Sequence, residues 1–138
     1  MSELKAEMEE LFADLCQVPR LVGSRRGFRP PVDVYRVDHP PSIVVVVELA
    51  GVEPGDVDLA VGDGILLLSG RRVRDAQARV FQQMEIEYGR FERRVPLAEP
   101  VDADAAEATY SRGLLTIVLP VAARTAGPVK VPVTRAST

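Results

Sequence analysis

The chain has 138 residues, of which 46% are hydrophobic and 27% charged, a balance typical of one globular domain with room for flanking segments. The net charge of -3 argues against a nucleic-acid-binding protein, because such proteins present an excess of basic residues. The single cysteine, Cys16, excludes an internal disulfide, and the first residues lack the order of a secretion signal. The longest apolar run is too short to span a membrane. These features favour a cytoplasmic protein without stable membrane insertion.

Residues 1–29 are expected to form an N-terminal arm that is partly helical. Apolar side chains recur there at helical spacing, with acidic residues on the other sides. These apolar residues are Leu4, Met8, Leu11, Phe12 and Leu15. Pro19 ends the helix, and a linker with glycines and like charges follows at residues 23–27. Since no second helix follows, the apolar stripe must meet the rest of the chain, another subunit or another protein.

From Pro30 onward the apolar period changes from helical spacing to alternation, which predicts strands. A valine-rich run at residues 42–50 has the composition of a buried strand. Asp63 and Gly64 predict a tight hairpin, because glycine accepts the positive φ that such turns need. Further strands are expected at residues 32–35, 57–61, 65–69, 91–97, 107–112 and 114–119, with a short one at 80–84. Seven to eight short strands predict an all-β, immunoglobulin-like β-sandwich over residues 30–121.

Residues 122–138 are expected to form a flexible C-terminal extension, because they are rich in Ala, Thr, Pro and Val. Every second residue from 129 to 133 is a valine: Val129, Val131 and Val133. In an extended chain, side chains two residues apart lie on one face and can enter adjacent pockets of a groove. Which pair of valines docks stays open, and a frayed end is the alternative.

The residues of the chain do not favour an enzyme. One histidine, His39, and one cysteine cannot form a Cys/His zinc cluster, and no nucleophile elbow is present. The Gly62-Asp63-Gly64 sequence lacks the remaining residues of a phosphate-binding loop. Three acidic residues at 102, 104 and 107 match no calcium loop. We therefore expect no catalytic residue, no metal and no cofactor.

Several motifs in one order resemble a known family. The first, A-x-x-x-n-G-v-L, fits Ala108, Gly113, Leu114 and Leu115, with Arg112 at the polar position. The second, G-x-F-x-R-x-[FV]-x-L-P, fits Gly89, Phe91, Arg93, Val95 and Leu97, with Ala98 in place of proline. Residues 48–52 resemble D-L-P-G-V. This order of motifs resembles the small heat shock proteins, the Hsp20 family built on the α-crystallin domain.

The resemblance implies an ATP-independent chaperone that binds partly unfolded client proteins and prevents their aggregation. It also implies homodimers that exchange a strand from a long loop and assemble into larger homo-oligomers. The exchanged strand would contain Val80, Phe81, Gln82, Gln83 and Met84. A neighbour's tail would enter a groove lined by Val57, Leu59, Val61, Ala108 and Tyr110.

The apolar stripe of the N-terminal arm would then bind clients and other subunits, with packing inside the chain as the alternative. A second class fits the sandwich pattern too: a co-chaperone or interaction module of the CS/p23 type. Such modules lack the exchanged loop and the valine tail, so a monomer in solution would favour that interpretation.

Overall fold

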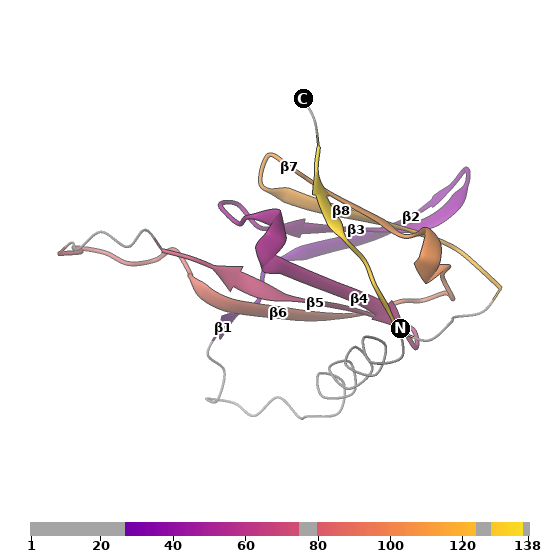
Figure 1. Cartoon of the computed structure of the whole chain (residues 1–138), viewed down its shortest axis with the longest axis horizontal. Helices are drawn as coiled ribbons and strands as arrows, with labels where there is room; N and C mark the ends of the chain where they lie inside the picture. Colours follow the sequence, from indigo (N-terminus) through magenta and orange to yellow (C-terminus); the bar gives the residue numbers. More distant parts are fainter. Residues whose placement is uncertain (1–26, 75–79, 124–127, 137–138) are drawn as a thin grey trace.

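The computed structural model describes residues 27–74, 80–123 and 128–136, and strands dominate all three ranges. Two five-stranded sheets face each other and form a sandwich (Figure 1). The all-β, immunoglobulin-like architecture predicted from the alternating pattern is therefore confirmed. Residues 1–26 of the expected N-terminal arm, with its apolar stripe, lie outside the described residues, whereas residues 27–29 are described.

The first sheet has the strand order β1-β6-β5-β4-β9. Its strands are β1 (Gly27–Phe28), β4 (Val57–Gly62), β5 (Ile65–Arg72), β6 (Gly89–Pro96) and β9 (Val129–Lys130). The second sheet has the order β10-β7-β8-β3-β2. Its strands are β2 (Val32–Asp38), β3 (Pro41–Glu48), β7 (Glu107–Ser111), β8 (Leu114–Pro120) and β10 (Val133–Arg135). Two short 3-10 helices, η1 (Pro54–Asp56) and η2 (Ala103–Ala105), precede β4 and β7.

Two hairpins take the tight form that their turn residues favour. The predicted turn between β4 and β5 has positive φ at both Asp63 (53°) and Gly64 (76°). The turn between β7 and β8 repeats this pattern at Arg112 (53°) and Gly113 (81°). Two successive positive φ values match the right-handed twist of the flanking strands. The break expected at Gly113 is thus a hairpin that pairs β7 with β8.

The core lies between the sheets and is built from the inward residues of the central strands. Val45, Leu66 and Leu115 have no exposed surface, and neither do Ile117 and Leu119. Burying an aliphatic side chain of this size contributes about 1.5–3 kcal/mol relative to leaving it exposed. Because apolar residues alternate along the strands, each sheet has one apolar face. The burial of these two faces against each other holds the sandwich together.

The sequence did not predict β1, because Gly27 belongs to an arginine- and glycine-rich stretch. In the structure Gly27 and Phe28 pair in parallel with Arg90 and Phe91 of β6. Glycine is required at this point, since a Cβ on Gly27 would lie 2.0 Å from the carbonyl oxygen of Arg90. Phe28 is buried against Phe91, with 5.6 Å between the ring centroids.

Two further segments differ from expectation. Residues 80–84 form no strand in the single chain, although a short strand was predicted there. A strand needs a pairing partner, and no strand of the described residues pairs with this segment. The described part of the C-terminal extension, residues 128–136, is not free but lies against the sandwich as β9 and β10.

Candidate functional site

The C-terminal tail runs across one open side of the sandwich and joins the edges of both sheets (Figure 1). β9 pairs antiparallel with β4, with Lys130 opposite Ala60 and Val129 opposite Val61. β10 pairs in parallel with β7, with Val133 opposite Ala108. The tail thus lies between the edge strands β4 and β7, and we call the place that it fills the edge groove.

Val131 is the centre of this contact. Its side chain is 2% exposed, and its backbone N–H donates a 2.9 Å hydrogen bond to the carbonyl oxygen of Leu59. Val129 and Val133 are partly buried and pack against the same core. The three alternate valines therefore use one face of the tail, and Val131 belongs to both candidate pairs.

Of the five residues that were expected to line the groove, four pair with the tail or bond to it, namely Leu59, Val61, Ala108 and Tyr110, whereas Val57 shares only the core beneath it. Val57, Leu59 and Val61 are buried on the β4 side, and Ala108 and Tyr110 are buried on the β7 side. All five belong to one apolar cluster that also contains Val131. In the single chain the tail fills its own groove, whereas the sequence had suggested a contact between chains.

The end of the tail is held by polar contacts that sequence reasoning missed. Arg135 donates a 2.9 Å hydrogen bond to the Glu53 carboxylate, and its guanidinium lies 5.8 Å from the centre of the Tyr110 ring. The Ala136 N–H donates to the carbonyl oxygen of Tyr110 at 3.0 Å, and the Thr134 hydroxyl donates to the carbonyl oxygen of Ala108 at 3.3 Å. The only sequence signal was that Arg135 continues the alternation of the three valines.

Tyr110 has a second role in the groove. Its buried hydroxyl donates a 2.7 Å hydrogen bond to the carbonyl oxygen of Leu49. Leu49 is fully buried and lies just beyond the end of β3, where its carbonyl oxygen is no longer part of a strand. The Tyr110 hydroxyl supplies the hydrogen bond that this buried oxygen needs. The bond fixes the ring that forms the β7 wall of the groove.

The segment expected to exchange between chains is exposed and apolar. Val80 is 96% exposed, and Met84 and Ile86 are also exposed, at 59% and 64%. Phe81 is 41% exposed, and the intervening Gln82 and Gln83 are exposed as well. The segment therefore leaves several apolar side chains accessible to solvent.

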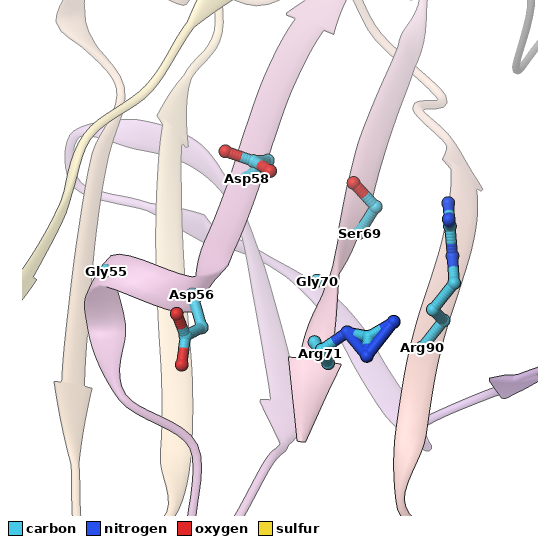
Figure 2. A pocket seen from close by; sticks show the side chains of 7 residues that line it. All are labelled: Gly55, Asp56, Asp58, Ser69, Gly70, Arg71 and Arg90. Atoms are coloured by element: carbon cyan, nitrogen blue, oxygen red, sulfur yellow. The ribbon is translucent and has the colours of Figure 1, made fainter. Parts of the chain in front are cut away.

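A second feature is a shallow polar pocket of about 330 Å³ on the outer face of the first sheet (Figure 2). Asp56 and Asp58 come from one side, and Arg71 and Arg90 from the other. Ser69 lies between them on β5, and Gly55 and Gly70 complete the lining. Because its charged residues are solvent-exposed and of both signs, the pocket resembles a hydrated sheet surface more than a reaction site.

Two arginines outside the groove link distant parts of the chain. Arg36 Nε donates to the Glu99 carboxylate at 2.6 Å, and this hydrogen bond raises the pKa of the Arg36 guanidinium. Arg93 donates to the carbonyl oxygen of Pro30 at 2.9 Å. Burial lowers the pKa of Arg93, and the positive charge of Arg29 adds to this effect. Each arginine thus ties a strand to a connecting segment, Arg36 of β2 to the segment after β6 and Arg93 of β6 to the segment before β2.

The described residues contain no group of three or more His, Cys, Asp or Glu side chains that could hold a metal ion. His39 lies in the turn between β2 and β3, next to Pro40. Within the same residues, no helix has the length and apolar character needed to cross a membrane. The geometry of the described residues is that of a β-sandwich whose own extended tail pairs with an edge strand of each sheet.

Comparisons with known proteins agree with this geometry. Residues 35–134 match the sequence model of the Hsp20/alpha crystallin family. Heat shock protein 16 of Schizosaccharomyces pombe is 33% identical over 119 residues, covering 82% of this chain and 82% of that protein. The 19.0 kDa class II heat shock protein of Oryza sativa subsp. japonica is 36% identical over 97 residues. That match covers 64% of this chain and only 55% of the rice protein.

Solved structures give the same result. Heat shock protein 16.0 from Schizosaccharomyces pombe superposes with a TM-score of 0.62 at 31% identity, covering 71% of this chain and 90% of that one. A small heat-shock protein from Xylella fastidiosa superposes with a TM-score of 0.59 at 33% identity, covering 70% and 89%. Between the two families weighed from the sequence, these matches decide against the CS/p23 type. The chain belongs to the Hsp20/alpha crystallin family, whose members are small heat shock chaperones and not enzymes.

Proposed function

We propose that this protein is an ATP-independent chaperone of the cytoplasm that binds partly unfolded proteins and keeps them from aggregating. Family membership supports a chaperone role. The observation that carries the proposal is the edge groove, in which the extended valine-bearing tail is held by backbone pairing and by packing against the apolar core. An unfolded client offers many extended apolar segments of this kind.

Passive binding is also what the energetics of such a site allow. One buried valine contributes at most a few kcal/mol, and the ordering of a bound segment subtracts from that. Single contacts of this strength form and break readily, whereas several of them on one client hold it firmly. A holdase needs contacts that are weak singly and strong together, because it must hold its client firmly and later release it without hydrolysing ATP itself.

The proposal is tested by capture of an unfolding client. A heat-labile enzyme is warmed with a stoichiometric amount of the chain and without ATP, and the mixture is separated by size-exclusion chromatography with light scattering. We expect a soluble complex that contains both proteins. Client found only in the pellet, with the chain alone in solution, would reject the holdase activity.

We further propose that residues 80–84 pair with the free edge of β2 in a second copy of the chain. β2 ends the second sheet, and its Val34 and Tyr35 are about half exposed. An open edge strand and an unpaired apolar segment are complementary, since each supplies the hydrogen-bond partners that the other lacks. Deleting residues 80–84 is expected to give monomers or aggregates, and intact dimers would reject the exchange.

Larger assemblies would form when a tail enters the edge groove of a neighbouring chain in place of its own. The contacts would be the same in both cases, as in domain swapping, so chain concentration would select between them. The related structure from Xylella fastidiosa is described as having a distinct high order structure. The apolar stripe of the N-terminal arm, at residues 4–15, would add client binding and contacts between subunits.

A further inference from the structure

Arginine and aromatic side chains alternate in a continuous stack at the root of the segment that joins β5 to β6. The guanidinium of Arg72 lies 4.6 Å from the centre of the Phe28 ring and 5.5 Å from that of Tyr88. The guanidinium of Arg74 lies 4.3 Å from the centre of the Tyr88 ring and 5.0 Å from that of Phe81. All four distances are within the ~6 Å range of cation–π attraction. We call these five residues the arginine–aromatic stack.

One end of the stack is fixed in the sandwich. Phe28 is buried and packs on Phe91 of β6. Arg72 also donates two hydrogen bonds to the carbonyl oxygen of Glu87, at 2.9 Å and 2.6 Å, and one to that of Ala50 at 3.1 Å. Arg72 therefore ties the end of β5 to the chain that returns toward β6 and to the turn after β3. These are charge-assisted bonds, which are stronger than neutral ones.

The other end of the stack reaches into the exposed segment. Beyond the ends of β5 and β6, residues 80–88 extend away from the sandwich (Figure 1). Phe81 contacts Arg74, while Val80, Met84 and Ile86 stay exposed. The stack thus holds the root of the segment and leaves its apolar residues available.

We infer that the arginine–aromatic stack positions residues 80–86 for pairing with a second copy of this chain. The inference rests on the strand-exchanged dimer proposed above. A segment whose root is already ordered loses less conformational entropy when its partner binds, so the stack raises the affinity of the dimer. Arg72 fixes Tyr88 to the sandwich through Phe28, and Arg74 holds Phe81 against Tyr88. Both arginines are positioning residues that leave the strand pairing itself to residues 80–86.

The test compares Arg74→Ala with Arg71→Ala in the full chain. Arg74 contacts the rings of Tyr88 and Phe81, whereas Arg71 is its exposed neighbour on β5 and lies outside the stack. The two variants lose the same charge. The dimer dissociation constant is measured by native mass spectrometry over a dilution series. We expect Arg74→Ala to raise it about five- to thirty-fold over Arg71→Ala, the effect of losing two cation–π contacts.

Two further measurements separate positioning from folding. Arg74→Lys keeps the charge without the flat guanidinium, so its dissociation constant should fall between those of the wild type and Arg74→Ala. Amide hydrogen exchange of residues 85–88 should be faster in Arg74→Ala, while exchange in β3 and β8 stays unchanged. Equal exchange at residues 85–88 in both alanine variants would overturn the inference.

The outcomes also separate this inference from the proposed dimer. If the wild type forms dimers and the two alanine variants have the same dimer dissociation constant, the role of the stack is rejected. The proposed strand exchange is not affected by that result. Wild-type chains that stay monomeric at every concentration reject strand exchange and, with it, the role of the stack.

Discussion

The backbone N–H of Val131 donates a hydrogen bond to the carbonyl oxygen of Leu59, and this bond lies at the centre of the contact between the tail and the edge groove. It continues the first sheet beyond β4 at the point where Val129 and Lys130 pair with that strand. Pro132 follows, and the chain then crosses to β7 of the second sheet. A proline at the crossing suits a residue between two strands, because its missing N–H is not needed by either sheet.

Replacing Val131 and Val133 together by alanine should weaken tail docking. Each change removes two carbon atoms from the groove and about 1.5 kcal/mol of apolar burial. Larger assemblies should dissolve while dimers persist, as measured by size-exclusion chromatography with light scattering. Leu114→Ala, at a 44% exposed position of β8 that lies outside both the edge groove and residues 80–84, provides a control for the loss of apolar carbon atoms. An unchanged assembly mass in the tail variant would contradict tail docking.

Arg135→Gln should have a small effect on the tail. The Arg135–Glu53 ion pair is solvent-exposed, with side chains 57% and 76% exposed. Exposed pairs of this kind contribute less than about 1 kcal/mol, and salt screens them. Assembly mass measured at low and at high salt should therefore differ only slightly from that of the wild type. A loss of assembly as large as that of the valine variant would show that the ion pair, and not apolar burial, dominates docking.

Tyr110→Phe should lower the stability of the sandwich without changing the shape of the groove. The substitution removes the buried hydrogen bond to the Leu49 carbonyl and leaves that group without this partner. The expected cost is about 1–3 kcal/mol in the free energy of unfolding, measured by denaturant titration at fixed protein concentration. The tail should still dock, since the ring remains. A variant as stable as the wild type would mean that water replaces the hydroxyl.

Gly70→Ala should disturb the core because no space exists for a Cβ at this position. The added atom would lie 2.3 Å from the carbonyl oxygen of Asp56 and 2.5 Å from Phe91 Cζ. Overpacking of this kind costs about 1–3 kcal/mol in the free energy of unfolding. Gly55→Ala is the matched control, since nothing lies within 4 Å of its Cβ position. Equal stability of the two variants in thermal unfolding would contradict the packing at Gly70.

Local chemistry explains which parts of the fold could be predicted from the sequence. Asp63 and Gly64 have the turn preferences of a tight hairpin, and the structure has that hairpin. Alternation along β4 and the valine run of β3 indicated strands, because side-chain period and burial are properties of neighbouring residues. The family motif around Ala108 and Gly113 coincides with the hairpin of β7 and β8, whose turn is likewise formed by neighbouring residues.

The features that could not be predicted depend on residues far apart in the chain. Nothing near Gly27 indicates that Arg90 approaches it closely enough to exclude a side chain. The pairing of Arg135 with Glu53 and the arginine–aromatic stack likewise require the folded arrangement. Residues 80–84 have strand composition, but a strand also needs a partner, and none of the described strands pairs with them.

The most direct test of the chaperone function is light scattering from a heat-aggregating protein incubated with this chain in the absence of ATP. A stoichiometric amount of the chain should suppress most of the scattering, and an equal mass of an unrelated β-sandwich protein should not. The variant that lacks residues 80–84 serves as a second comparison for the contribution of the exposed segment. Scattering as strong with the wild-type chain as without it would contradict the chaperone function.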